Sequence, residues 1–140
     1  MKLIFSLLTA IGLLSNIQAA DQAPKPETGA TAPKKFKNVD AETFEKLRKE
    51  DKNAVVLDVR TQEEYKQGHI PGSVQIDFNS PDFDKEVAKL DKNRTYLVHC
   101  AAGGRSARAC KKMDGMNFSK LYNLEGGMGA WEKAGKAVEK

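Results

Sequence analysis

The chain has 140 residues, with 23 Lys or Arg against 19 Asp or Glu, and a pool of two Cys and two His. This length fits one domain of ordinary size rather than two, and such a domain folds without disulfides or a metal. Cys100 and Cys110 are not the close pair typical of a structural zinc site, and the formal charge of +4 is too evenly interleaved with acidic residues to indicate nucleic-acid binding.

Residues 1–20 have the pattern of a secretory signal peptide. Lys2 supplies a positive charge, and residues 3–14 form an apolar run that is shorter than the ~20 residues needed to span a bilayer. The small residues Ala19 and Ala20 suit a signal peptidase. We therefore expect an exported protein, periplasmic or secreted, with no stable membrane anchor after cleavage.

Residues 21–35 are rich in Pro, Ala, Thr, Gly and Lys and predict a flexible linker, which leaves 36–140 as the folded domain. Within that domain, short apolar runs alternate with helical patterns. Strands are predicted at 36–39, 54–59, 73–76, 95–99 and 120–124, and helices at 41–50, 61–68, 81–90, 105–113 and 128–134, with Asp40, Thr61 and Ser80 as N-caps. This alternation predicts a three-layer α/β fold with a mostly parallel sheet, whose ligand site lies at the carboxyl ends of the strands.

Cys100 lies between a predicted strand and a loop of small residues that leads into a helix. Such a loop lets backbone N–H groups turn inward, and with the helix N-terminus they form a concavity of positive potential. A thiolate there has a lowered pKa and is nucleophilic at neutral pH. We therefore predict that Cys100 is catalytic and that the next five residues bind substrate, with the last of them adding charge or anchoring the loop: Ala101, Ala102, Gly103, Gly104 and Arg105.

Two neighbouring residues are expected to have no catalytic role. Cys110 falls in step with Ala107 and Met113 on the predicted helix, which favours a core position over a redox role. His99 precedes Cys100 along a strand, so its side chain should lie on the opposite face of the sheet and serve poorly as a base.

Three segments resemble the rhodanese domain, in its single-domain, periplasmic type of thiosulfate sulfurtransferase. The segments similar to the family's DVR…GHIPGA block, its CxxGxRS loop and its LxGGxxAWxxAG ending are, in order, Val56–Ser73, Cys100–Ser106 and Leu124–Gly135. The resemblance spans about residues 36–138. It implies a three-layer rhodanese-like fold around a five-stranded parallel sheet.

The resemblance also implies a persulfide mechanism without a metal or an organic cofactor. Cys100 would attack a sulfane sulfur donor such as thiosulfate and pass the sulfur to a thiophilic acceptor such as cyanide or a thiol. The expected partners are therefore a small anionic sulfur donor and that acceptor, with no nucleic acid, and a monomer is favoured. The other motif residues have structural roles in this interpretation: Asp58 and Arg60 as an ion pair or loop anchor, His69 in a rigid turn, and Trp131 in the core.

Three alternatives stay open at this point. Cysteine-dependent phosphatases and arsenate reductases have five residues between Cys and Arg, one more than this chain has between Cys100 and Arg105, so a tetrahedral oxyanion fits poorly. A thiol redox protein would pair Cys100 with Cys110. A non-catalytic rhodanese module could carry or bind a persulfide. The physiological donor and acceptor are not determined by the sequence.

Overall fold

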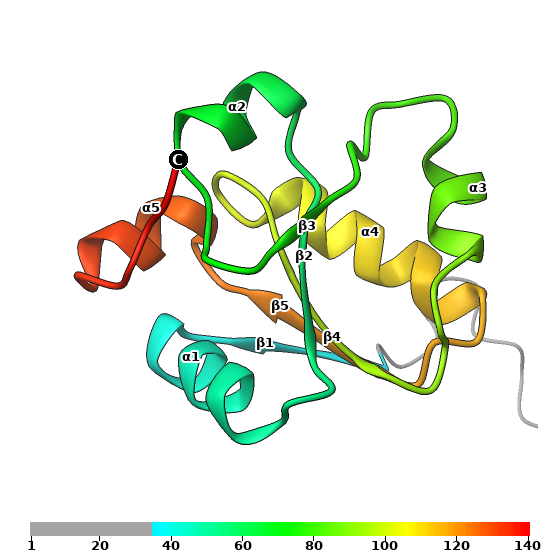
Figure 1. Ribbon diagram of the computed structural model, residues 1–140. Helices are drawn as coiled ribbons and strands as arrows, with labels where there is room; N and C mark the ends of the chain where they lie inside the picture. The colour runs from blue at the N-terminus through cyan, green and yellow to red at the C-terminus, as the bar shows by residue number, and fades with distance from the viewer. Residues whose placement is uncertain (1–34) are drawn as a thin grey trace, which may run out of the picture. The chain divides into compact units, whose positions relative to one another are not determined.

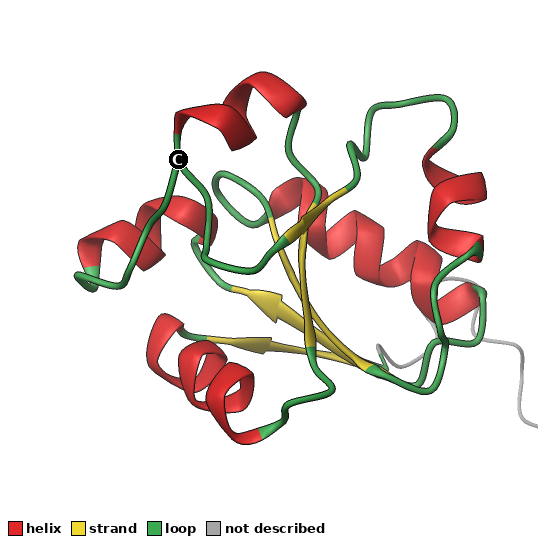
Figure 2. Ribbon diagram, viewed as in Figure 1, coloured by secondary structure: helices red, strands yellow, loops and turns green. Residues whose placement is uncertain are grey.

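The structure is a computed structural model that describes residues 35–140, in which strands and helices alternate along the chain (Figures 1 and 2). The predicted signal peptide and almost all of the predicted linker lie outside the described residues. The strands are β1 (Phe36–Val39), β2 (Val55–Asp58), β3 (Val74–Gln75), β4 (Thr95–His99) and β5 (Lys120–Leu124). The helices are α1 (Ala41–Glu50), α2 (Gln62–Gln67), α3 (Phe83–Ala88), α4 (Gly104–Gly115) and α5 (Gly127–Lys133). None of these helices is long and apolar enough to cross a membrane.

The five strands form one sheet in the order β1-β5-β4-β2-β3, and every neighbouring pair is parallel. This confirms the predicted α/β fold with a five-stranded parallel sheet. All residues of β4 are buried, as expected of a strand covered by helices on both faces. Because all strands run the same way, their carboxyl ends meet at one edge, and β4 delivers Cys100 to the middle of that edge.

The sheet separates two apolar clusters, which makes the domain three-layered. Side chains of β4 alternate between them: Tyr96 and Val98 pack with α3 and α4, whereas Leu97 packs with α1 and α5. Figure 1 shows these two helix pairs on opposite sides of the sheet. Cys110 belongs to the first cluster and Trp131 to the second, both with no exposed surface, so both predicted core positions are confirmed.

Two of the three predicted N-caps are confirmed. Asp40 accepts a hydrogen bond from the Thr43 N–H at 2.8 Å, which satisfies a free donor at the start of α1. Thr61 and Glu64 form a capping box at the start of α2.

The predicted start of the third helix was wrong by two residues. The Ser80 hydroxyl accepts from the Asp82 N–H at 3.1 Å, and the Phe83 N–H bonds to the Ser80 carbonyl, so Ser80 closes a turn instead of capping a helix. The helix begins at Phe83 and ends before Leu90. Local side-chain bonds of this kind compete with helix formation, and periodicity alone does not reveal the outcome.

Candidate active site

Cys100 occupies the first position after β4, and a tight loop separates it from α4. Gly103 has a φ of 103°, a left-handed conformation that side chains disfavour, and it is the N-cap residue of α4. A Cβ at this residue would also lie 3.4 Å from the Gly126 nitrogen. The small residues predicted to form a concavity therefore form a loop whose backbone reverses direction at Gly103.

The sulfur of Cys100 receives hydrogen bonds from neutral groups. The Gly103 N–H donates to Sγ at 3.0 Å, and the Ser106 hydroxyl lies 3.3 Å from Sγ. Burial by itself raises the pKa of the Cys100 thiol, but hydrogen bonds from the Ser106 hydroxyl and from the N–H groups of Ser106, Ala102 and Gly103 outweigh it, and the pKa is lowered. Cys100 is 1% exposed, so the sulfur is almost entirely shielded from solvent.

The carbonyl groups of Cys100 and Ala101 face α5 and accept hydrogen bonds from its backbone. The Met128 N–H donates to the Cys100 carbonyl at 2.8 Å, and the Gly129 N–H donates to the Ala101 carbonyl at 3.2 Å. This approach is so close that a Cβ on Gly127 would lie 2.5 Å from the Cys100 carbonyl oxygen. Helix α5 is thus part of the site, because it fixes the direction of the loop's peptide groups.

Arg105 anchors the loop to α2. Its guanidinium makes a bidentate ion pair with Glu64, at 2.8 Å and 3.0 Å. The pair lowers the pKa of Glu64 to about 2 and raises that of Arg105, so both groups are charged across the working pH range. Of the two roles predicted for Arg105, the structure shows the anchor; direct substrate binding by its side chain stays a prediction.

His99 lies behind the nucleophile and faces away from it. Its ring packs edge-on against Phe44 on the other face of the sheet, with centroids 6.3 Å apart. Nδ1 is 3.3 Å from the Cys100 carbonyl oxygen, and complete burial lowers the pKa of His99. The imidazole therefore lies on the wrong face of the sheet to act as a base for the thiol, as predicted, and burial favours its neutral form.

The remaining motif residues hold the framework beside the site. Asp58 and Arg60 form a buried ion pair at 2.7 Å, and Arg60 also donates to the Gly68 carbonyl at 2.7 Å. This confirms the predicted ion pair and shows that Arg60 ties β2 to the turn after α2. The His69 ring stacks on Tyr65 with centroids 3.8 Å apart, consistent with a role in that turn.

Sequence reasoning missed the roles of Ser106, Glu64 and Gly127. Ser106 lies within the quoted CxxGxRS motif, and the first turn of a helix is where a hydroxyl can bond back to the preceding loop. Glu64 lies within the first of the three motifs, and its partner Arg105 lies 41 positions away. Gly127 lies within the LxGGxxAWxxAG motif, just before the helix predicted at 128–134.

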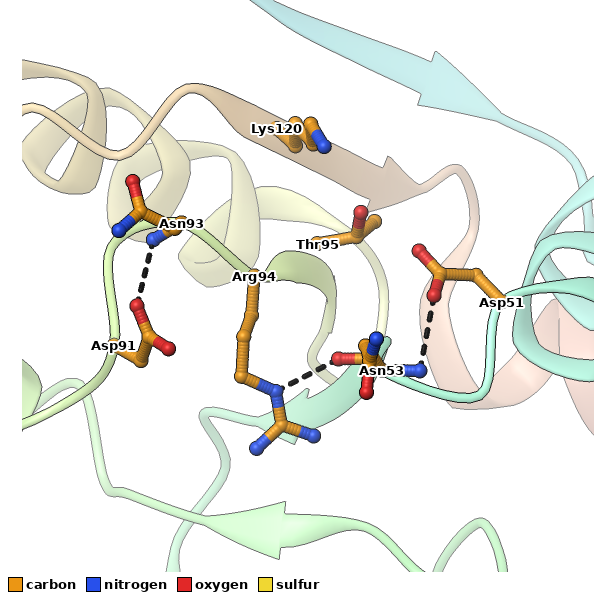
Figure 3. Close-up of a pocket in the computed structure, with 7 residues that line it drawn as sticks. All are labelled: Asp51, Asn53, Asp91, Asn93, Arg94, Thr95 and Lys120. Atoms are coloured by element: carbon orange, nitrogen blue, oxygen red, sulfur yellow. Dashed lines mark hydrogen bonds between the residues drawn. The ribbon is translucent and has the colours of Figure 1, made fainter.

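A hollow lies at the edge of the sheet opposite Cys100, where the strands begin (Figure 3). Its volume is about 490 Å³, and its lining residues are Asp51, Asn53, Asp91, Asn93, Arg94, Thr95 and Lys120. The side chains there bond locally: each of the two Asp carboxylates accepts from the backbone N–H of the Asn two residues on, and Arg94 donates to the Asn53 carbonyl. These turns precede β2 and β4 and are remote from Cys100.

Residues 40–134 match the rhodanese-like domain, and the chain belongs to this family. Thiosulfate sulfurtransferase GlpE of Pseudomonas savastanoi pv. phaseolicola is 35% identical over 97 residues, covering 69% of this chain and 87% of that protein. A sulfurtransferase of Allochromatium vinosum is 27% identical over 100 residues, covering 71% and 92%. The crystal structure of a rhodanese-related protein from Thermoplasma volcanium matches with a TM-score of 0.65 at 27% identity, covering 74% and 97%. Membership in the family and relatives named as sulfurtransferases support sulfurtransferase activity.

Proposed function

We propose that this chain is a sulfurtransferase that carries sulfur as a persulfide on Cys100. The observation that carries the proposal is the set of neutral donors around Sγ, above all the Gly103 N–H at 3.0 Å and the Ser106 hydroxyl at 3.3 Å. These donors favour a thiolate, which is the form that attacks sulfur. After transfer, the same inward-facing N–H groups stabilise the negative charge on the terminal sulfur.

The proposed reaction has two displacements at sulfur. The Cys100 thiolate attacks the outer sulfur of thiosulfate, the sulfur–sulfur bond of the donor breaks, and sulfite leaves with the bonding electron pair. Cyanide or a thiolate then attacks the terminal sulfur of the persulfide and regenerates the Cys100 thiolate. Neither step requires an oxidant or a metal, and neither requires a general base, because the nucleophile is already ionised.

Intact-mass measurement tests this proposal directly. The protein incubated with thiosulfate should gain the mass of one sulfur atom, and cyanide should remove it with formation of thiocyanate. Cys110→Ala should load sulfur like the unaltered protein, whereas Cys100→Ser should not load. A protein that gains no sulfur, or that loads equally well after Cys100→Ser, would contradict the proposal.

The thiol redox alternative receives little support from the second cysteine. Cys110 is fully buried, and burial raises its pKa to about 12. A thiol in this state is protonated and inaccessible at neutral pH, so it makes a poor resolving group for a disulfide with Cys100.

Export is proposed on the sequence of residues 1–20 alone. The mature N-terminus should be Ala20 or Asp21, and the protein should be recovered outside the cytoplasm. N-terminal sequencing of the exported pool checks this, and Met1 at the N-terminus of that pool would contradict it. Size-exclusion chromatography with light scattering checks the proposed monomer.

A further inference from the structure

The cation that follows the active loop, Arg105, is already paired with an acidic group. Both of its terminal nitrogens donate to the carboxylate of Glu64, at 2.8 Å and 3.0 Å, in a bidentate geometry. The pair is partly buried, with the side chains 20% and 32% exposed, which limits screening by water. The guanidinium is close enough to Cys100 for the negative charge of the thiolate to raise the pKa of Arg105.

The other groups near this pair add negative charge or none. The Asp77 carboxylate also acts on Arg105 and raises its pKa, which places a second acidic group near the guanidinium. Ala101 and Ala102 bring no charge to the loop. Hydrogen bonds from the Ser106 hydroxyl and from backbone N–H groups lower the pKa of the Cys100 thiol.

Two of the cations further along α4 contact groups outside the loop. The guanidinium of Arg108 lies 5.4 Å from the ring centroid of Phe78, and Lys112 is paired with Asp84 at 3.0 Å. The hydroxyl and N–H dipoles of the site therefore suit one negatively charged sulfur. The paired side-chain charges around it leave no net positive charge to balance a second negative charge on the donor.

We propose that Glu64 is a specificity-determining residue. It makes the site favour low-molecular-weight persulfides, in which the reacting sulfur is the only ionisable group, over the thiosulfate dianion. This rests on the proposed sulfurtransferase function and defines its substrate class. Glu64 acts through Arg105: by holding the guanidinium, it neutralises a side chain that could otherwise balance the sulfonate end of thiosulfate.

The sulfur transfer from such a donor is balanced without a further reactant. The Cys100 thiolate attacks the terminal sulfur of R–S–SH, the donor's sulfur–sulfur bond breaks, and its electron pair leaves with R–S⁻. The products are a thiolate and Cys100–S–SH, which can ionise beside the N–H groups of the loop. One S–S bond is exchanged for another, so there is no net oxidation.

The test compares kcat/KM for thiosulfate with kcat/KM for 2-hydroxyethyl persulfide, whose organic part is uncharged. The unaltered protein should favour the persulfide. Glu64→Gln keeps an oxygen for the Thr61 cap but frees the charge of Arg105, so the thiosulfate-to-persulfide ratio should rise on the order of tenfold, as expected for one hydrogen-bonded charge interaction. Glu63→Gln removes the same charge from an exposed neighbour on α2 and should change the ratio by less than about twofold.

Two further variants separate charge from a loss of structure. Arg105→Gln leaves Glu64 unpaired and should lower the ratio, whereas Glu64→Gln combined with Arg105→Gln removes both charges and should return the ratio toward that of the unaltered protein. If the single variants acted only by detaching the loop from α2, the double variant would instead have the same kcat/KM ratio as the more strongly affected single variant. Thermal melting confirms that each variant is folded at the assay temperature.

The outcomes distinguish the proposed role of Glu64 from the proposed sulfurtransferase function on which it rests. If neither donor loads sulfur on Cys100, the sulfurtransferase function itself fails, and the role of Glu64 falls with it. If both donors load Cys100 but Glu64→Gln and Glu63→Gln leave the ratio equally unchanged, the sulfurtransferase function stands and the role of Glu64 is wrong. A preference of the unaltered protein for thiosulfate would overturn the proposed donor class.

Discussion

At the scale of single residues, hydrogen bonds stabilise the thiolate of Cys100. The Ser106 hydroxyl is placed to donate either to Sγ at 3.3 Å or to the Gly103 carbonyl at 3.2 Å, and its single proton serves one acceptor at a time. A negative sulfur is the stronger acceptor, so ionisation of Cys100 draws the hydroxyl to it. Ser106 thereby responds to the charge state of the nucleophile.

Ser106→Ala removes this donor and should raise the pKa of the Cys100 thiol. Activity increases with pH as the thiolate forms, so the acid limb of the kcat/KM profile should move to higher pH in the variant. The loss should therefore be large at neutral pH and should shrink as the pH rises past the new pKa. Ultraviolet titration of the thiolate alongside the pH–rate profile checks the shift. Ser106→Thr keeps the hydroxyl and should restore the profile of the unaltered protein; an acid limb that stays in place after Ser106→Ala would contradict this role.

The two cysteines should separate activity from stability. Cys100→Ser should abolish turnover and leave the melting temperature nearly unchanged, because a hydroxyl is of similar size but has a far higher pKa. Cys110→Ala should keep most activity and cost about 1–2 kcal/mol of unfolding free energy, as deletion of a small buried group does. Turnover and thermal melting of both variants decide the matter. If Cys110→Ala lost activity fully while melting normally, Cys110 would be a resolving thiol.

At the scale of elements, the site is formed where α5 meets the loop after β4. The backbone of Gly127 has a φ of 57° and touches the Cys100 carbonyl group, and the next two N–H groups of α5 donate to the loop. Side chains rarely adopt this φ, and the space for a Cβ is already filled by backbone atoms. Only glycine meets both conditions.

Gly127→Ala should therefore push the loop away from α5, lower kcat/KM at least tenfold and lower the melting temperature. Gly129→Ala is a matched control on the same helix, because its Cβ would lie 3.8 Å from the Ala101 carbonyl oxygen in ordinary contact. This control should be active and at least as stable as the unaltered protein, since alanine favours helix more than glycine does. Equal activity in both variants would show that the close approach at Gly127 does not position the loop.

Local patterns predicted most elements and the nucleophile, because both depend on short-range physics. The buried run of β4, the break at Gly103 and the cap at Thr61 are each visible within a few residues. The contacts of Glu64 and Gly127 were not predictable in this way, because they join segments that meet only after the sheet has formed. The prediction of where α3 starts was wrong for another reason. A turn at Ser80 and a helix capped by Ser80 begin with similar residues, and only the backbone geometry distinguishes the two.

At the scale of the whole molecule, the C-terminal residues tie α5 to the turn that follows α2. His69 and Glu139 exchange two backbone hydrogen bonds, at 2.8 Å and 2.9 Å, and the indole N–H of Trp131 donates to the Ala137 carbonyl at 2.8 Å. Val138 also packs close to Gly68: a Cβ on Gly68 would lie 3.0 Å from Cγ1 of Val138. The two helices that hold the active loop, α2 and α5, are thus joined by the end of the chain.

Deletion of residues 137–140 should remove this tie, with a cost of about 1–3 kcal/mol from the lost hydrogen bonds of His69 and Trp131. Removal of Lys140 alone should have no measurable effect, because the hydrogen bonds begin at Glu139. Thermal melting measures the cost, and hydrogen exchange should show faster opening at residues 68–72. An unchanged exchange rate in that turn after the larger deletion would mean that the C-terminal segment only lies on the surface.

The pairing of β1 with β5 has a consequence for how the domain folds. Phe36 is paired with Leu121, so β1 gains its neighbour in the sheet only when β5, far along the chain, has been brought beside it. The donors that orient the loop at Cys100 come later still, from α5. Before α5 has docked, the cysteine is therefore an ordinary, weakly reactive thiol, and it becomes an activated nucleophile only once the sheet has closed.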